Sequence, residues 1–338
     1  MTPSGNDVCL RLDEVRDLAY SVLNRAGCDE DNADAIADTI FKAERDGAHA
    51  HGLFRLPGYV ASLKSGKVDG RARPVWERIA PSVLRVDGAN GYAPLALRTL
   101  RDPLVELAES QGIAAAALIR THHFAPLWVE VEAIAERGLA ALACTAYKPA
   151  IPPAGGAKPV YGTNPLAFAW PRPGGDPMVF DQASAVMSRG DVMIAARDGR
   201  PLPEGVGIDA RGRPTTDAGE VLKGAILPFG GYKGAAIALM IELLVGPLIG
   251  ERTSPEAKAA DLEDGGPPRG GEFILAIAPS RFGNPGGWAD KAEALFKEIL
   301  AQEGVRLPGD GRRARRARIL KEGVTVPGDL YRTIRDLT

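Results

Sequence analysis

The sequence is poor in the residues and patterns that mark several common protein classes. Its three cysteines, Cys9, Cys28 and Cys144, are odd in number, far apart and without a CxxC pair. Neither a disulfide framework nor a cysteine-based zinc site is therefore indicated. The formal net charge is only −2 and the pI is about 6.2. Such a balanced charge does not favour nucleic acid as a partner.

Targeting and membrane signals are also missing. The N-terminus has no basic region followed by an apolar one, which a secretory signal would need. The longest apolar stretch, 235–249, is interrupted by Glu242 and by Gly246-Pro247. It is too short and too interrupted to span a bilayer. We therefore expect a cytoplasmic protein without a membrane partner.

The common dinucleotide-binding fingerprint is absent, because no GxGxxG follows a strand and opens a helix. What the chain does contain is a regular alternation of elements. From about residue 75, short apolar runs such as 113–121 and 139–146 alternate with helical stretches such as 96–112. Glycine (40 residues) and proline (27 residues) punctuate these runs as turns. The alternation predicts an α/β architecture, and 338 residues are enough for two domains.

Histidine is scarce, and all four histidines fall in two short stretches. His49 and His51 are followed by Arg55. An imidazole can move a proton near neutral pH, and a guanidinium can hold a carboxylate through two hydrogen bonds. The pair therefore suits a small acidic substrate, although a His–Arg pair can equally be a surface or core feature.

The second stretch, His122-His123, follows the apolar run 113–119, which is predicted to be a buried strand. Ligands tend to bind at the ends of such strands in α/β sheets. A tandem histidine could also hold a metal. Neighbouring residues on a strand point to opposite faces, however, and no carboxylate or cysteine follows at a metal-like spacing. We expect no metal.

Three further features are open to a functional or a structural interpretation. The turn 229–236 places three glycines and Lys233 before a long apolar helix, where backbone N–H groups could approach an anion or simply pack closely. Asp181 and Asp191 each follow a predicted strand or turn, and either could orient an imidazole or only cap a turn. The arginine-rich tail 311–323 has the pattern of a solvated helix face.

Several stretches taken together resemble the type-2 malate/L-lactate dehydrogenase family. They are AHGLFRLPGYVASLKSGKV, YGTNPLAFAWPRPGG, GIDARGRPTTD and LPFGGYKGAAIALMIELL, in that order. The resemblance covers roughly residues 10–335. It implies a mixed sheet that binds NAD(P) without a Rossmann fold, with helical N- and C-terminal segments packed together. It also implies a substrate and dimerisation domain (1–80 plus 288–338), a cofactor-binding domain (81–287) and a homodimer.

Within this family, HHFAPLWVEVEA and WPRPGGDP are most similar to reductases of Δ1-piperideine-2-carboxylate and Δ1-pyrroline-2-carboxylate. These enzymes reduce cyclic imino acids to L-pipecolate and L-proline. The resemblance implies that His51 donates the proton, Arg55 binds the substrate carboxylate and Thr163 lies at the substrate. By its distance along the chain from His51, Asp191 matches the family's orienting acid better than Asp181.

The cofactor implied by the resemblance is NADPH, with NADH as the alternative. The residues that would contact it are His122, His123, Phe124, Ala125, Pro126, Asp181, Gln182, Ala183, Tyr232 and Lys233.

Two departures from the family pattern leave the reaction open. The family usually has serine before the histidine, in a relay with it, but position 50 is alanine. In 181–190, DQASAVMSRG, a Thr-Ser pair and an alanine before Arg-Gly are more common. The alternatives are a dehydrogenase of 2-hydroxy acids (malate, lactate or sulfolactate) and a catalytically weak homologue that binds a dinucleotide.

Overall fold

The computed structural model describes residues 7–122, 125–283 and 286–337. Its centre is a seven-stranded sheet in the order β2-β3-β4-β11-β5-β6-β7. These strands are β2 (Val75–Ala80), β3 (Val83–Asp87), β4 (Ile113–His122), β5 (Ala140–Thr145), β6 (Leu166–Trp170), β7 (Met178–Gln182) and β11 (Arg269–Ile277). Only β3 and β4 pair in parallel within this sheet, and its other described pairs are antiparallel.

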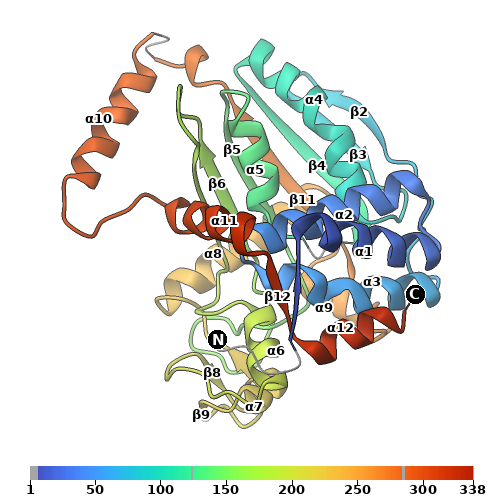
Figure 1. Cartoon of the computed structure of the whole chain (residues 1–338). Helices are drawn as coiled ribbons and strands as arrows, with labels where there is room; N and C mark the ends of the chain where they lie inside the picture. The colour runs from blue at the N-terminus through green and yellow to red at the C-terminus, as the bar shows by residue number, and fades with distance from the viewer. Residues whose placement is uncertain (1–6, 123–124, 284–285, 338) are drawn as a thin grey trace.

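Two helices cover one face of the sheet, namely α4 (Ala93–Gln111) and α5 (Trp128–Ala135) (Figure 1). Alternate residues of a strand face the same side, and here many of them are alanine. The alanines that share the core with the two helices include Ala114, Ala116, Ala141, Ala143, Ala167, Ala169 and Ala276. Their small side chains leave room for the leucines and valines of the helices. On the opposite face, α8 (Tyr232–Leu243) packs against Cys144 and Phe273.

The two ends of the chain form a second body beside the sheet (Figure 1). It consists of β1 (Val8–Leu10), α1 (Leu12–Arg25), α2 (Glu30–Arg45), α3 (Leu56–Lys64), α11 (Asp310–Glu322), β12 (Val324–Val326) and α12 (Gly328–Arg335). β1 pairs with β12, and Ile36 of α2 shares one core with Ile319 and Ile334. The expected packing of N- and C-terminal segments is therefore present.

A third, smaller cluster lies below the sheet in Figure 1. It contains α6 (Arg189–Arg197), β8 (Gly207–Ile208), β9 (Pro214–Thr215), α7 (Ala218–Lys223) and β10 (Ala225–Ile226). The Gly- and Pro-rich sequence around β8 and β9 reads as a loop, yet it contributes two short strands to a three-stranded sheet.

The remaining described elements are short or peripheral. They are η1 (His49–His51), η2 (Leu53–Arg55), the π-helical η3 (Leu244–Leu248), α9 (Ser254–Ala259), η4 (Pro279–Arg281) and α10 (Trp288–Leu300). In Figure 1, α10 stands apart from the body, and Trp288 of this helix makes an edge-to-face contact with Trp170 of β6. Among the described residues, no helix is long and apolar enough to cross a membrane.

Candidate active site

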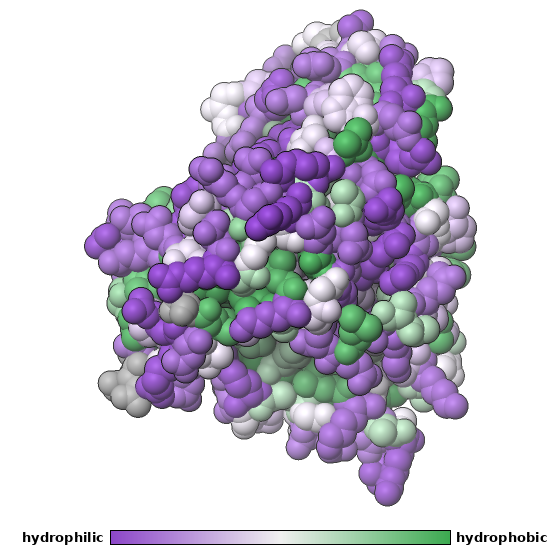
Figure 2. Space-filling view, turned by 90° about the vertical axis from the view of Figure 1, so that its right-hand side faces the viewer, coloured by the Kyte–Doolittle hydropathy of each residue, from purple (hydrophilic) through white to green (hydrophobic). Residues whose placement is uncertain are grey.

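A cavity of about 1020 Å³ is lined by residues of all three parts of the chain. Its walls include the histidine segment (residues 49–55, η1 and η2), α6, the turn before β6, the end of β7 and the start of α5. The predicted site residues that line it are His51, Arg55, Ala125, Thr163, Asp181, Gln182, Ala183 and Asp191. Figure 2 shows a hollow on one face of the molecule, with apolar residues in its floor and hydrophilic residues around it.

The histidine segment is held by the buried carboxylate of Glu44 at the end of α2. Its Oε1 accepts a hydrogen bond from the Leu53 backbone N–H at 2.8 Å, and its Oε2 lies 2.6 Å from Nδ1 of His49. Gly52 makes this approach possible, because a Cβ there would lie 2.0 Å from the Glu44 oxygen. The hydrogen bond to Glu44 raises the pKa of His49. Both histidines line the cavity, and His49 is distinguished by the bond between its Nδ1 and the Glu44 carboxylate.

Arg55 is oriented by the backbone of the same segment. Its Nε donates a hydrogen bond to the Ala50 carbonyl oxygen at 2.7 Å. Burial lowers the pKa of the guanidinium, and the Asp191 carboxylate nearby has the opposite effect on it. A guanidinium fixed through Nε presents its terminal nitrogens in a defined plane, which suits two-pronged binding of a carboxylate.

Asp191 reaches the cavity from the first turn of α6. Ser188, the N-cap of this helix, accepts a hydrogen bond from the Asp191 backbone N–H at 3.0 Å. Gly190, which directly precedes Asp191, lies against the histidine segment. A Cβ on Gly190 would be 2.8 Å from a terminal nitrogen of Arg55 and 3.0 Å from the Ala50 methyl. Glycine at this position therefore lets α6 and the histidine segment meet.

Thr163 is placed by a turn whose anchor is far along the chain. The next residue, Asn164, is fully buried and has a positive φ of 35°. Its side-chain nitrogen donates to Oε1 of Glu242 at 2.8 Å, and the Ser254 backbone N–H donates to the other Glu242 oxygen at 2.9 Å. Glu242, which interrupts the apolar stretch of α8 in sequence, is therefore a buried anchor for this wall of the cavity.

Asp181 lines the cavity near the start of α5. Its Oδ2 accepts a hydrogen bond from the Trp128 backbone N–H at 3.1 Å. Burial raises the pKa of this carboxyl to about 6, against the effect of that hydrogen bond. Trp128 also lines the cavity, and its indole Nε1 donates to Asp46 at 3.1 Å. The sequence contained no signal that singled out Trp128.

The arginine-rich helix α11 is not simply a solvated face, which corrects the interpretation from sequence. Arg316 donates to both oxygens of the buried Asp46, at 2.8 Å each, and also to Glu132 at 2.9 Å. Arg312 is buried and donates to Glu132 at 2.9 Å. Asp46 directly follows α2 and precedes the histidine segment, so α11 braces this wall. Removing one partner of such a buried ion pair costs about 3–5 kcal/mol of stability.

Of the ten predicted cofactor residues, four do not line the cavity, namely His122, Pro126, Tyr232 and Lys233, and two lie outside the described residues. His122 is buried, with Nδ1 3.2 Å from the Pro267 carbonyl oxygen and Nε2 3.2 Å from the side-chain oxygen of Asn90. Burial lowers its pKa to about 4, so it is neutral at pH 7. Pro126 is not among the lining residues. His123 and Phe124 lie outside the described residues.

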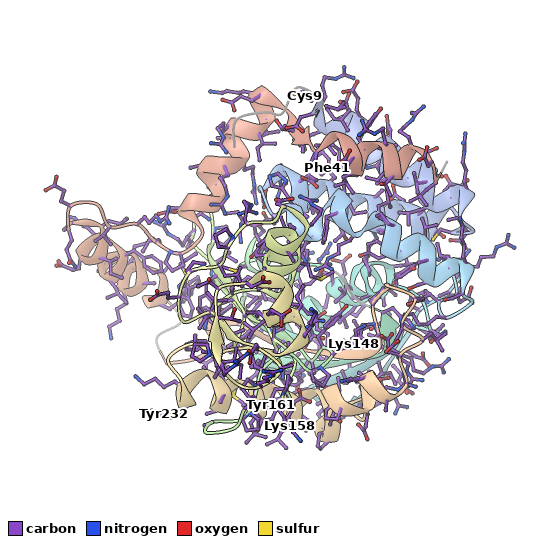
Figure 3. The ribbon with its side chains drawn as sticks, turned by 90° about the horizontal axis from the view of Figure 1, so that it is seen from below. Cys9, Phe41, Lys148, Lys158, Tyr161 and Tyr232 are labelled. Atoms are coloured by element: carbon purple, nitrogen blue, oxygen red, sulfur yellow. The ribbon has the colours of Figure 1, made fainter. Side chains whose placement is uncertain are left out.

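Tyr232 and Lys233 also lie away from this cavity. Tyr232 is 69% exposed at the start of α8. In Figure 3 it lies at the edge of the molecule, well separated from Lys148, which lines the cavity. The glycine turn before them is therefore a surface feature in the single chain. Within the described part of the chain, no group of three or more His, Cys, Asp or Glu side chains could hold a metal ion.

A family model described as malate/L-lactate dehydrogenase matches residues 10–335. The Δ1-pyrroline-2-carboxylate/Δ1-piperideine-2-carboxylate reductase of Pseudomonas aeruginosa is 48% identical over 329 residues, 96% of this chain and 98% of that protein. The Δ1-piperideine-2-carboxylate reductase of Pseudomonas syringae pv. tomato has a solved structure with a TM-score of 0.91 and 39% identity, covering 98% of this chain and 100% of that one. A (2R)-3-sulfolactate dehydrogenase (NADP(+)) of Chromohalobacter salexigens is 41% identical, over 91% of both chains.

The fold, the cavity and these matches together identify the class of enzyme. The protein is an oxidoreductase whose sheet is mostly antiparallel, unlike the mostly parallel sheet of the Rossmann fold. The chain belongs to the malate/L-lactate dehydrogenase family, because the family model spans nearly all of it. The resemblance found in sequence and the expected mixed α/β fold are both confirmed.

Proposed function

We propose that this protein reduces a small cyclic imino acid, Δ1-pyrroline-2-carboxylate or Δ1-piperideine-2-carboxylate, to L-proline or L-pipecolate with NADPH. The observation that carries the proposal is the pairing of Arg55 and His51 on one short segment at one cavity. Relatives named as reductases of these two imino acids support it at 48% and 39% identity.

In this proposal Arg55 holds the substrate carboxylate and thereby sets which face of the ring is attacked. Such fixed orientation removes much of the entropic barrier of a reaction. His51 gives a proton to the ring nitrogen, while a hydride reaches the adjacent carbon, so that C=N becomes CH–NH. Asp191 orients His51, and Thr163 contacts the substrate. Bound reduced nicotinamide would supply the hydride.

The cavity wall favours an imine with ring methylenes over a doubly charged keto acid. Phe54, Met193 and Ile194 line it and offer apolar contacts. Lys148, a second cation at the wall, donates to the buried Asp261 carboxylate at 2.6 Å. A lysine already paired in this way is less suited to binding a second acidic group of a substrate.

The cavity residues also fit a phosphate-bearing dinucleotide. The volume of about 1020 Å³ exceeds the need of a five- or six-membered imino acid, since pockets for drug-sized ligands start at about 300 Å³. Arg197, Arg200, Arg315 and Arg318 line it. Three of them form ion pairs, with Asp198 or Glu322, that are more exposed than that of Lys148, and such exposed pairs are weak enough for a phosphate to replace. Ala125, Asp181, Gln182 and Ala183 would hold the cofactor. The arginines are our reason to prefer NADPH, with its extra phosphate, over NADH.

The proposal extends to the organisation of the protein. We infer a homodimer in the cytoplasm, with the segments 1–80 and 288–338 forming the substrate and dimerisation domain and 81–287 the cofactor-binding domain. The pairing of β1 with β12 and the core shared by α2 and α11 support joining the two ends. His122, His123, Phe124, Pro126, Tyr232 and Lys233 stay predictions as cofactor contacts.

Steady-state assays with a substrate panel test this function. Δ1-Pyrroline-2-carboxylate, Δ1-piperideine-2-carboxylate, pyruvate, oxaloacetate and 3-sulfopyruvate would each be measured with NADPH and with NADH. We expect the highest kcat/KM with the two imines and NADPH. Oxidation of NADPH with keto acids alone would overturn the proposal.

Two alternatives have their own support. A sulfolactate-type dehydrogenase is favoured by Arg189, a further cation at the cavity wall that acts electrostatically on Arg55, and by the sulfolactate relative. It predicts turnover of 3-sulfopyruvate above that of the imines. A catalytically weak homologue is favoured by Ala50, which cannot hydrogen-bond to His51 through its side chain. It predicts binding of NADPH by calorimetry without its oxidation by any compound of the panel.

A further inference from the structure

The first turn of α6 carries a serine whose hydroxyl is bonded twice to one aspartate. Oγ of Ser188 accepts the Asp191 backbone N–H at 3.0 Å and donates its own proton to Oδ2 of Asp191 at 2.7 Å. The first bond is an ordinary helix N-cap. The second is a charge-assisted bond between a hydroxyl and a carboxylate, which is stronger than a neutral one. It restricts rotation of the Asp191 carboxylate.

This turn lies at the reactive end of the cavity. Ser188, Gly190 and Asp191 all line it, together with His51 and Arg55. The Gly190 backbone abuts the Ala50 methyl and a terminal nitrogen of Arg55, so α6 and the histidine segment are in direct contact. The charge of Asp191 acts on Arg55 across this contact. The orientation of the Asp191 carboxylate therefore affects the guanidinium that would bind the substrate, at the wall that His51 also lines.

The other side of the contact offers no hydroxyl of its own. Residue 50 precedes His51 and faces Gly190, and it is a buried alanine. Among the described residues, Ser188 donates a side-chain hydrogen bond to Asp191. The described hydroxyl that holds the Asp191 carboxylate therefore comes from the helix side of this contact.

We propose that Ser188 is a positioning residue, whose hydroxyl holds the Asp191 carboxylate in the orientation from which it acts on His51 and Arg55. This inference rests on the proposed function for its catalytic consequence. It adds to that function a residue that does not itself touch the substrate.

The test must separate positioning from helix capping. Glycine is nearly as good an N-cap as serine, whereas alanine is poor. Ser188→Gly therefore keeps most of the helix stability and removes the donated hydrogen bond, and Ser188→Thr keeps both bonds. We expect Ser188→Gly to lower kcat about tenfold, the scale of one hydrogen bond to a charged group. Its melting temperature should stay close to that of the unchanged protein, and Ser188→Thr should keep kcat within about twofold.

A double-mutant cycle and a titration complete the experiment. In an Asp191→Asn background, Ser188→Gly should have little further effect on kcat, because the carboxylate that it orients is gone. With four histidines in the chain, the His51 resonance can be assigned by comparison with His51→Ala and followed by NMR. A carboxylate that no longer faces the imidazole favours its charged form less, so the pKa of His51 should fall in Ser188→Gly.

The outcomes separate this inference from the proposed function. An unchanged His51 pKa and an unchanged kcat in Ser188→Gly would overturn the role of Ser188, even if the protein reduces imines. An equal loss of kcat in the Asp191→Asn background would overturn it too. A lowered His51 pKa in a protein that reduces no imine would support the positioning and reject the reaction.

Discussion

Three histidines lie in the described part of the chain: His49 and His51 in the histidine segment, and His122 at the end of β4. The fold gives the two regions different surroundings. His51 lies on a short 3-10 turn at the wall of the cavity. His122 lies in a ten-residue strand and is buried, opposite Arg269 of β11. His49, two residues before His51, is bonded to Glu44. One residue type thus has three environments.

The difference shows that the end of a strand is a weaker guide to a ligand site than it is in parallel sheets. Ligands collect at strand ends where parallel strands all end on the same edge. In this sheet β11 runs antiparallel to both β4 and β5, so its start covers the end of β4. His122 is therefore enclosed by Pro267 and Asn90. The turn at η1 has no such partner strand in the described structure and stays at the cavity.

The largest expected effect comes from removing the imidazole of His51. His51→Ala should lower kcat/KM for the preferred imine about 10²- to 10⁴-fold, the usual contribution of a general acid. His49→Ala is the matched control: His49 also lines the cavity, but its Nδ1 is bonded to Glu44, so we expect kcat/KM to change by less than about tenfold. Equal losses in the two variants would mean that the segment as a whole, rather than His51, carries the activity.

The second effect concerns His122 and stability. Its folded-state pKa of about 4 is below the ordinary 6.5, so between these values the unfolded chain binds more protons. Stability should therefore fall as pH decreases from 6.5 to 4, by about 1.4 kcal/mol per pH unit at most. Denaturant unfolding at pH 7 and pH 5 measures this slope. His122→Gln should flatten it while kcat at pH 7 stays within a few-fold. A steep slope in the variant would assign it to other groups.

The third effect concerns Arg55 and the binding of the substrate. Arg55→Ala removes a charge-assisted pair of hydrogen bonds, worth about 1.5–3 kcal/mol, and should raise KM about 10- to 100-fold. Arg55→Lys keeps the charge but loses the two-pronged geometry, so its KM should lie between that of the unchanged protein and that of Arg55→Ala. A loss confined to kcat, with KM unchanged, would show that Arg55 does not hold the substrate carboxylate.

The smallest effect belongs to His49, whose pKa is raised by its hydrogen bond to Glu44. A raised folded-state pKa stabilises the protein below the ordinary value and loses this contribution as pH rises through the raised value. The side chain is 55% exposed, so the contribution should be below about 1 kcal/mol. The difference in unfolding free energy between the unchanged protein and His49→Gln should shrink from pH 6 to pH 9. Growth of that difference with pH would contradict the assignment.

Much of the fold could be predicted from local sequence. The strand β5 lies within the predicted run 139–146, β4 matches the run 113–121 to within one residue, and α4 begins three residues before the predicted segment 96–112. The histidine segment with Arg55 was also found by residue type and spacing alone. These features depend on neighbours along the chain, and the sequence displays such neighbours directly.

Other features depend on partners that no local pattern reveals. Arg316 and Asp46 are 270 positions apart, and only folding shows that the arginine-rich tail neutralises a buried carboxylate next to the histidine segment. Glu242 looks like an interruption of an apolar helix until Asn164, 78 positions away, donates to it. Burying a carboxylate is unfavourable without such donors, so their presence explains both residues.

By itself the sequence determined the chemistry that is available: an imidazole and a guanidinium four residues apart, the family pattern around them, and a methyl group at position 50. The tertiary structure decided which of these groups meet. It brought Ser188 and Asp191 to the histidine segment through the contact of Gly190 with Ala50, and it enclosed His122 behind β11. The physical reason is that residue type sets what a side chain can do, whereas burial and long-range hydrogen bonds set its charge, orientation and access.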